Sequence, residues 1–291
     1  MPQVDTQQST ARLDAGQVAA YHRDGYVTVD GLLTPAEVAE LQQVTDEFVE
    51  RSRAVTAHTD VFDLEPGHTP ESPKLRRLKA PHRQHPVYDR LLRDARILDL
   101  VGQLIGPAIR FNNTKLNMKS PEFGSPVGWH QDWAFYPHTN DDLLAVGIAI
   151  DDMLVENGCL MAVPGSHRGP TLDHHQHGVF VGATDGDGAG AVPLELHAGG
   201  ISLHHVRLVH GSAPNTSSRP RRFLLFEYGS ADAWPLLGVR GWAEYHSRLL
   251  RGEEVSEPRM TAVPVRIPLP EPERVCSIYE LQSQRDGART T

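Results

Sequence analysis

The sequence predicts a mostly β protein with flanking helices, in which N-terminal helices buttress a sandwich or barrel core. Two observations carry this prediction. The first third of the 291 residues has apolar side chains at helical spacing, whereas from Arg110 onward short runs of branched and apolar residues alternate with turn-forming clusters. Helices followed by many short strands favour an all-β core with helical support.

The first two helices have clear boundaries in the sequence. The segment "LDAGQVAAYHRDG" is expected to form a short helix that ends at Gly25, and the strand "YVTVDGLL" follows it. The second helix begins after Thr34, a capping residue, with Pro35 at the first helical position and Glu37 where a capping box needs a carboxylate. Its apolar stripe consists of Val38, Leu41, Val44 and Phe48.

A third helix is predicted from Val87 to Ile105, ending before Gly106-Pro107. Beyond it the sequence contains five short apolar runs separated by turn-forming residues, which is typical of strands. The predicted strands are "RFNNTKLNM", "LLAVGIAI", "GCLMAV", "ISLHHVRLV" and "RFLLFEYG".

The domain organisation is expected to be simple. Residues 1–10 and 282–291 are polar and are predicted to be disordered tails. Residues 11–281 are predicted to form one domain, with a helical part over 11–106, the β core over 107–232 and a C-terminal extension over 233–281. The polar stretches 53–73 and 170–192 are interpreted as loops or lids, because no linker is long enough to separate a second domain.

The composition narrows the classes of function. It is 39% hydrophobic and 22% charged, as in a globular protein, and the formal charge of −9 argues against nucleic acid or an anionic membrane as the partner. No apolar run approaches the ~18 residues of a membrane-spanning helix, and "MPQVDTQQST" lacks the pattern of a signal peptide. With two cysteines, Cys159 and Cys276, the sequence favours a reducing, cytoplasmic location.

The stretch "VGWHQDWAFYPH" places His130 and Asp132 two residues apart among aromatic side chains. Aromatic neighbours indicate burial, and a buried carboxylate must be paired or bound to a metal. On a strand, residues i and i+2 project to one face, so His130 and Asp132 converge while Gln131 faces away. The pair predicts part of a site with two histidines and one carboxylate, the type that holds Fe(II). The alternative is a buried hydrogen-bonded His–Asp pair.

Three histidines in "ISLHHVRLVHGSAPN" are candidates for the third ligand: His204, His205 and His210. His205 points to the opposite side of the strand. His204 and His210 share a face but would lie about 20 Å apart on an extended strand, so at most one reaches the metal. His210 is preferred because Gly211-Ser212 ends the strand there, beside a loop. His204 and His205 are interpreted as packed or partly exposed strand histidines.

Arg221 follows His210 by eleven residues, in "RPRRFLLFEYG". It begins the next predicted strand, so a hairpin would return it to the side of His210. A guanidinium in a metal cavity suits bidentate binding of a carboxylate. The alternative is a solvated arginine in a basic turn, which is the interpretation for Arg219 and Arg222.

Four separated blocks of the sequence, in the right order, resemble the phytanoyl-CoA dioxygenase family of Fe(II)- and 2-oxoglutarate-dependent oxygenases. The resemblance runs from Tyr21 to about Gly241. The blocks are "YHRDGYVTVDGLLTPAEVAEL", "HQDWAFYPHTNDDLLAVGIAIDDMLVENGCLMAVPGSHRG", "LVHGSAPNTSSRPRR" and "YGSADAWPLLGVRG".

The resemblance implies a double-stranded β-helix, a cupin-like jelly-roll core, and it implies iron held by His130, Asp132 and His210. It further implies that 2-oxoglutarate chelates the iron and that its distal carboxylate binds Arg221 with help from Ser212. The cosubstrates would then be 2-oxoglutarate and O2, with ascorbate stimulating the reaction.

Three further positions matter in the comparison with the family. Lys79 matches a lysine that family members point at the cosubstrate, and Gln131 follows the family's HQD pattern. Ile148 departs from the family, because some relatives carry a tryptophan there, near the cosubstrate. This departure bears on the cavity wall and not on the ligands.

The implied reaction is hydroxylation, or another oxidation, of a small to medium organic molecule with release of succinate and CO2. The presence of Asp132 argues against halogenation, because related halogenases replace this carboxylate with a small residue. Two alternatives are a Zn- or Mn-dependent cupin-like hydrolase or isomerase with the same ligands, and a non-catalytic jelly-roll binding protein. The substrate stays open among acyl-CoA thioesters, phosphonates, amino-acid derivatives and natural products, although the acidic chain favours a smaller or less phosphorylated one.

Four weaker features have structural interpretations. The histidines of "DHHQHG" are assigned to a polar lid loop and the basic run 74–83 to a solvated helix face, with a coenzyme A phosphate site as the alternative for the run. Residues 133–136 are candidates for the substrate pocket. Lys115 shares a strand face with Asn113 and Asn117 and is expected to look into the cavity.

Overall fold

The computed structural model describes residues 11–270 and 277–287. The predicted tail over 1–10, residues 288–291 of the other predicted tail, and Cys276 therefore lie outside the described residues.

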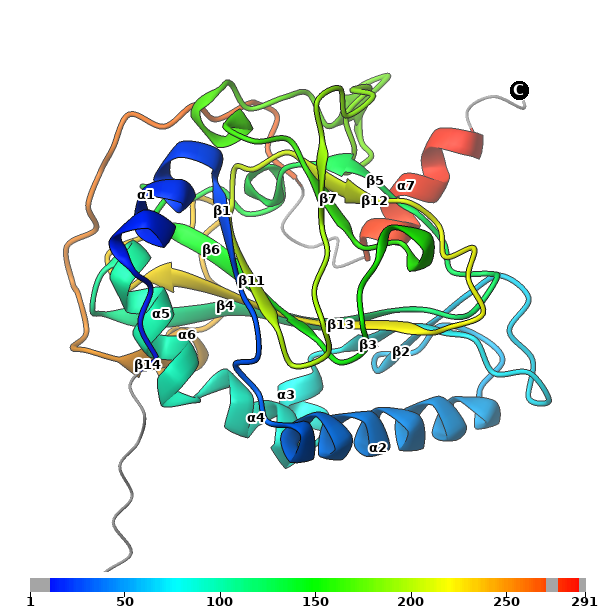
Figure 1. Ribbon diagram of the computed structural model, residues 1–291. Helices are drawn as coiled ribbons and strands as arrows, with labels where there is room; N and C mark the ends of the chain where they lie inside the picture. The colour runs from blue at the N-terminus through cyan, green and yellow to red at the C-terminus, as the bar shows by residue number, and fades with distance from the viewer. Residues whose placement is uncertain (1–10, 271–276, 288–291) are drawn as a thin grey trace, which may run out of the picture.

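Two antiparallel sheets form the core (Figure 1). The larger sheet has the order β1-β11-β6-β13-β4-β3-β2, with β14 against β4. Its strands are β1 (Tyr26–Val29), β2 (Phe62–Leu64), β3 (Leu75–Lys79), β4 (Ile109–Lys119), β6 (Leu143–Ala149), β11 (Ile201–His205), β13 (Arg221–Ser230) and β14 (Leu249–Arg251).

The smaller sheet has the order β10-β7-β12-β5. From β4 to β7, and again from β10 to β13, successive strands alternate between the two sheets, which is the winding of a jelly roll. The predicted double-stranded β-helix is therefore confirmed. The strands of the smaller sheet and of a separate hairpin are β5 (Val127–His130), β7 (Leu160–Ala162), β10 (Val192–Leu194), β12 (His210–Ser212), β8 (His175–Gln176) and β9 (Val179–Phe180).

Helices cover the outer face of the larger sheet, and α2 runs along it at the bottom of Figure 1. The capping box of Thr34 and Glu37 is present at the start of α2, and its predicted apolar stripe is buried against the sheet. The helices are α1 (Ala15–Asp24), α2 (Pro35–Arg51), α3 (Pro81–Gln84), α4 (Pro86–Leu92), α5 (Ala95–Ile105), α6 (Trp242–Ser247) and α7 (Ile278–Gly287), with 3-10 turns η1 (Ser52–Ala54), η2 (Asp132–Ala134), η3 (Val155–Asn157) and η4 (Ser166–Arg168).

The single helix predicted over 87–105 is wrong, because the chain breaks at Arg93-Asp94 and forms α4 and α5. Asp94 has extended backbone and its side chain accepts a hydrogen bond from the backbone N–H of Arg96, so it starts a new helix. The helix face expected for the basic run 74–83 is also corrected, since residues 75–79 form strand β3.

The C-terminal part adds to both sides of the core. β14 extends the larger sheet next to β4, and α7 lies beside β5 and β12 (Figure 1). Since α7 continues to Gly287, it occupies much of the tail predicted over 282–291. Among the described residues, no helix has the length and apolar character that crossing a membrane requires.

Candidate metal centre and its cavity

Three side chains, two from neighbouring strands and one from the turn that follows the first strand, meet at one point of the smaller sheet. His130 is the last residue of β5 and His210 the first of β12, and the two lie opposite each other in the antiparallel ladder. Asp132 lies just past the strand, at the start of η2, and not on a strand as the i, i+2 argument assumed. His210 likewise begins its strand instead of ending one. The turn after β5 nevertheless brings the carboxylate to the histidines.

The geometry of these three residues suits a divalent metal. Asp132 Oδ1 lies 3.7 Å from His130 Nε2, and Asp132 Oδ2 lies 3.9 Å from His210 Nε2. One donor atom from each residue lies within 4.8 Å of the others. The Nδ1 atoms lie 2.8 Å from the carbonyl oxygen of Gly128 and 2.9 Å from that of Leu208, so each ring keeps its proton on Nδ1 and offers the Nε2 lone pair. This donor set fits Fe(II).

Burial and neighbouring charges keep His130 and Asp132 in the protonation states that metal binding requires. Burial, with His210 nearby, holds the pKa of His130 well below its usual value, so the ring is neutral. Burial would raise the pKa of Asp132, but Lys115 and the two histidines outweigh it, and the pKa of the carboxyl is lowered. Asp132 is thus a carboxylate at neutral pH.

Lys115 and Glu227 form a buried ion pair beside Asp132. The ammonium of Lys115 lies 2.7 Å from Glu227 Oε1 and 3.6 Å from Asp132 Oδ1. Burial lowers the pKa of Lys115, but the two carboxylates outweigh it and raise the pKa. Sequence reasoning placed Lys115 in the cavity and missed Glu227, because the partners lie on β4 and β13 and are joined only by the ladder between these strands.

His204 lies next to the metal centre, which corrects the expectation that it would be about 20 Å from His210 on one straight strand. The chain leaves β11 at His205 and turns before His210, so that the rings of His204 and His210 have their centroids 4.9 Å apart. His204 Nε2 lies 3.9 Å from Asp132 Oδ2. Its side chain is buried, and neither ring nitrogen has a hydrogen-bond partner among the described residues.

The cavity beside the triad has a volume of about 490 Å³, including the open space at its mouth. Arg221 lies in its wall, fully buried, and among the described residues no carboxylate forms an ion pair with it. A buried guanidinium without a partner is costly, so this end of the cavity fits an anionic ligand such as a carboxylate. The lining residues are Lys115, Asn117, Val127, His130, Asp132, Leu160, His204, His210, Gly211, Ser212, Arg221, Phe223, Leu225 and Ile278.

The sequence model of the phytanoyl-CoA dioxygenase family matches residues 21–223. The chain belongs to this family. It is 37% identical over 265 residues to a probable alpha-ketoglutarate-dependent hypophosphite dioxygenase of Stutzerimonas stutzeri, covering 88% of this chain and 92% of that protein. It is 29% identical over 242 residues to the ectoine dioxygenase of Sphingopyxis alaskensis, covering 76% and 77%.

The fold agrees with a solved member of the same group. The crystal structure of EctD from S. alaskensis with bound Fe superposes with a TM-score of 0.67 at 26% identity, covering 85% of this chain and 89% of that one. Together with the His-Asp-His group, these findings confirm the predicted enzyme class, an Fe(II)- and 2-oxoglutarate-dependent dioxygenase.

Two residues that the family resemblance places near the cosubstrate do not line the cavity of this phytanoyl-CoA dioxygenase family member. Lys79 lies on the same sheet face as Lys115, its neighbour across the ladder, but its ammonium is 2.7 Å from Asp63 Oδ1. The side chain of Gln131 donates to the carbonyl of Arg207 at 2.8 Å and accepts from the N–H of Leu172 at 2.8 Å, so it ties two loops behind the metal.

The side chain of Ile148 is on the other face of the sheet, in the apolar core under the helices, and it does not form a cavity wall. Trp133 is also turned away from the cavity, since its indole N–H donates to the carbonyl of Pro264 at 2.9 Å. Phe135 lies edge-on to His130, with ring centroids 6.0 Å apart. Within residues 133–136, Phe135 is therefore the residue whose ring packs against a histidine of the triad.

The "DHHQHG" loop contributes to the site through one residue that sequence reasoning missed. His174 is buried, and its Nε2 accepts a hydrogen bond at 2.9 Å from the backbone N–H of Gln131, the residue between His130 and Asp132. A single buried histidine within a polar loop has no signal in the sequence alone. His175 is near Asp173 and His177 is exposed, so among the described residues these histidines form no second metal cluster.

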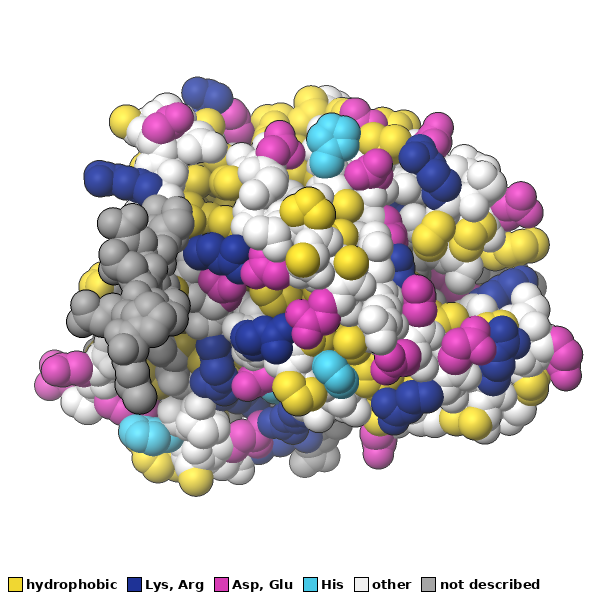
Figure 2. Space-filling view, turned by 60° about the horizontal axis from the view of Figure 1, so that its bottom comes forward, with side chains coloured by type: hydrophobic (Ala, Val, Ile, Leu, Met, Phe, Trp, Pro, Cys, Tyr) yellow, Lys and Arg dark blue, Asp and Glu magenta, His cyan; other side chains and the backbone are white. Residues whose placement is uncertain are grey.

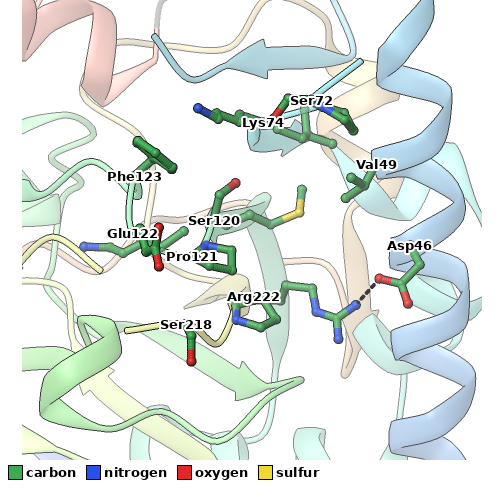
Figure 3. Close-up of a pocket in the computed structure, with 15 residues that line it drawn as sticks. Asp46, Val49, Ser72, Lys74, Ser120, Pro121, Glu122, Phe123, Ser218 and Arg222 are labelled. Atoms are coloured by element: carbon green, nitrogen blue, oxygen red, sulfur yellow. Dashed lines mark hydrogen bonds and ion pairs between the residues drawn. The ribbon is translucent and has the colours of Figure 1, made fainter. Parts of the chain in front are cut away.

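A second hollow, of about 1000 Å³ with its open space, lies on the surface between α2 and the loops around residues 72–75, 118–123 and 218–222 (Figure 3). It contains none of the triad. Arg222 in its wall is already paired with Asp46 and Asp151, each at 2.6 Å. Lys74 stands 3.7 Å over the ring of Phe123.

The basic run 74–83 does not form a continuous cationic groove. Several of its charges are matched locally, and on the face of Figure 2 basic side chains lie beside acidic ones. This arrangement favours ion pairing over a coenzyme A phosphate site. The pairs are Arg76–Glu65, Lys79–Asp63 and Arg83–Glu244.

Proposed function

We propose that this enzyme oxidises a small polar substrate, and that hypophosphite is the leading candidate. The similarity to the hypophosphite dioxygenase of S. stutzeri, which extends over most of both chains, supports this substrate. The modest cavity and the matched charges of the basic run favour it over an acyl-CoA thioester.

The proposal depends on one observation, that a single cavity contains both the candidate iron ligands and an arginine. His130, Asp132 and His210 meet at its wall, and Arg221 lies in the same cavity without an ion-pair partner among the described residues. We assign the triad as the Fe(II) ligands and Arg221, with Ser212, as the group that binds the distal carboxylate of 2-oxoglutarate. When bound, iron with 2-oxoglutarate supplies the activation of O2.

The other residues of the site hold these groups in place. Lys115, 3.6 Å from Asp132 Oδ1, offsets part of the charge of Asp132, while Glu227 holds Lys115 in place at 2.7 Å. Gln131 holds the loop that carries Asp132, and Lys79 acts from outside the cavity by pairing with Asp63. The apolar wall, Leu160 and Leu225 included, keeps water from the reacting atoms.

The strand register of the larger sheet shows how far apart His204 and Arg221 lie along the cavity. His204 lies opposite Ala145, which in turn lies opposite Glu227 on β13. Arg221 is six residues before Glu227 on this strand, about 20 Å away. We therefore assign the end beside Arg221 to the cosubstrate. The end beside His204, whose ring nitrogens have no hydrogen-bond partner among the described residues, is assigned to the substrate.

The proposed reaction balances with one O2 per turnover. One oxygen atom converts 2-oxoglutarate to succinate and CO2, and the other enters a P–H bond of hypophosphite to give phosphite. With Fe(II), ascorbate and 2-oxoglutarate, we expect hypophosphite to increase succinate release and to yield phosphite in an equal amount, measured by phosphorus NMR.

The matched control is His210→Ala, which removes one ligand and should abolish both products. Ectoine, the substrate named for the S. alaskensis relative, serves as the comparison compound. If ectoine and not hypophosphite stimulates succinate release, the substrate is wrong while the enzyme class stands. Metal-dependent turnover that needs no 2-oxoglutarate would contradict the class itself.

A further inference from the structure

The strand that carries His130 lies at the edge of the smaller sheet. In the order β10-β7-β12-β5, β12 pairs with one side of β5, and among the described residues no strand pairs with its other side. An unpaired strand edge presents backbone N–H and C=O groups that need partners. The segment 170–192, which the sequence predicts to be a loop or lid, supplies these partners.

Two hydrogen bonds from the segment 170–192 flank His130. The backbone N–H of Thr184 donates to the carbonyl of Trp129 at 2.8 Å. On the other side, Nε2 of His174 accepts from the backbone N–H of Gln131 at 2.9 Å. The segment thus binds both the residue before and the residue after this proposed iron ligand.

The ring of His174 is itself held in one orientation. It is 1% exposed, and its Nδ1 lies 2.9 Å from the carbonyl of Leu172, so the proton is on Nδ1 and Nε2 is the acceptor. The ring stacks on that of Phe180, with centroids 6.4 Å apart, and the N–H of Val181 donates to the carbonyl of His174 at 2.9 Å. His174 therefore presents a fixed lone pair to the backbone of Gln131.

Close packing also seats the segment on the strand and on the turn after it. A Cβ built on Gly188 would lie 2.0 Å from Cζ2 of Trp129, and one built on Gly182 would lie 2.7 Å from Cζ of Phe135. Both glycines have positive φ, +69° and +61°, so side chains are unfavourable there for a second reason. In this region the segment is therefore a clamp on the ligand strand and not an open lid.

The N–H that His174 binds belongs to the peptide group between His130 and Gln131. This peptide is part of the short backbone link between the two groups of the H-x-D pair, and Asp132 lies just beyond the strand, in the turn η2. Rotation of the peptide would move the carboxylate relative to the imidazole. A hydrogen bond that holds the peptide therefore helps to fix the spacing of the two metal-binding groups.

We propose that His174 is a positioning residue for the metal centre, and that the segment 170–192 holds the H-x-D pair in its iron-binding geometry through it. The inference rests on the proposed function, because it takes His130, Asp132 and His210 as the iron ligands. By reciprocity, a segment that favours metal binding is itself stabilised when the metal binds.

The first test compares two amide side chains that differ in reach. In His174→Gln, Oε1 can take the place of Nε2 and accept from the N–H of Gln131, whereas the side chain of His174→Asn reaches only the position of Nδ1. Calorimetry under nitrogen on the metal-free full chain gives the dissociation constant of Fe(II). We expect His174→Asn to weaken Fe(II) binding about tenfold or more, the usual effect of losing a group that orients metal ligands. His174→Gln should lose less than about threefold.

The second test measures the reciprocal effect by hydrogen exchange. In the wild type, Fe(II) should slow the exchange of backbone amides in residues 174–184. In His174→Asn this slowing should be smaller, because the segment is no longer joined to the peptide between the ligands. A purely structural role of His174 would leave the metal-dependent slowing intact.

The matched control is His138→Asn. His138 is also buried, and its Nδ1 makes the same contact two residues back, 2.7 Å from the carbonyl of Tyr136. The hydrogen bond of its ring is thus to Tyr136 and not to the peptide between the ligands. His138→Asn should bind Fe(II) as the wild type does.

Four results would overturn the inference. Equal Fe(II) affinities of His174→Asn and His174→Gln would show that the bond to Gln131 does not set the metal centre. A loss in His138→Asn as large as that in His174→Asn would assign the effect to fold stability. If neither His174 variant folds, the absence of Fe(II)-dependent slowing in the wild type decides against the inference. Failure of the wild type to bind Fe(II) would instead remove the proposed function, and the inference falls with it.

Discussion

At the residue scale, His204 distinguishes this site from a bare metal triad. Its ring is buried beside Asp132, yet both nitrogens are without partners among the described residues, whereas His130 and His210 each use Nδ1 on a backbone carbonyl. A donor and an acceptor held ready in this position suit an oxygen-bearing substrate, because the imidazole can turn either nitrogen toward it.

We predict that His204→Phe raises the KM for the proposed substrate, hypophosphite, tenfold or more, since a buried substrate oxygen would lose its partner. The KM for 2-oxoglutarate and the affinity for Fe(II) should change less than twofold. His204→Asn keeps a donor and an acceptor and should recover part of the loss. A parallel loss of Fe(II) affinity in His204→Phe would instead identify His204 as a metal ligand.

The sequence indicates the three proposed iron ligands and Arg221, but it does not indicate the residues that support them. The H-x-D pair, His210 and Arg221 stand at spacings that can be recognised in the sequence. His204 was misplaced because a straight strand was assumed where the chain turns after His205. Glu227 has no signal along the chain, since it meets its partner only across the sheet ladder.

At the element scale, the larger sheet has room for the ring of Phe223 because the neighbouring Gly147 has no side chain. Gly147 lies in β6 between β11 and β13, and a Cβ built on it would be 2.0 Å from Cζ of Phe223. Phe223 in turn lines the cavity. The glycine thus leaves space over β6 for the ring of Phe223, which forms part of the cavity wall.

We predict that Gly147→Ala destabilises the fold by about 1–3 kcal/mol, the usual effect of overpacking a core. It should also weaken 2-oxoglutarate binding, because Phe223 must move. Urea unfolding and calorimetry measure the two effects. Gly241→Ala is the control, as nothing lies within 4 Å of its added Cβ and its backbone is extended. Equal free energies of unfolding for the two variants would show that Phe223 can move without loss of stability.

Local signals predict the helices well where caps are complete. Thr34 and Glu37 mark the start of α2 correctly. The break between α4 and α5 was missed because the apolar periodicity continues across it, while the capping signal of Asp94 is a single residue. Asp132 was placed on a strand for a similar reason, since one residue decides where β5 ends.

At the scale of the whole molecule, buried histidines couple folding to pH. Burial lowers the pKa of His138 to about 4 and that of His205 to about 3, from 6.5. Between pH 6.5 and about 4 the unfolded chain therefore binds protons that the folded chain does not. By linkage, the free energy of unfolding falls as the pH falls through this range.

We predict that the metal-free protein loses stability from pH 7 to pH 5, by up to about 1.4 kcal/mol per pH unit for each such histidine. Urea unfolding at pH 7, 6 and 5 gives the slope. His138→Gln removes one titrating group and should make the slope shallower. A free energy of unfolding that is independent of pH would contradict this account.

The whole architecture was predictable only in part from the residues themselves. Alternating short strands after a helical third indicate a sandwich or barrel, and the family resemblance was needed to predict a jelly roll. The docking of α7 was not foreseen, because its polar sequence resembles a tail and its anchors, Gly128 and Gly182, are far away in the chain.

The division of the site between the two sheets has a consequence for engineering. The triad comes from the smaller sheet and the turn after β5, whereas Lys115, His204 and Arg221 come from the larger one. A mutant library confined to the cavity-facing positions of the larger sheet, with Lys115 and Arg221 kept, would therefore sample new substrates while the three proposed iron ligands stay unchanged.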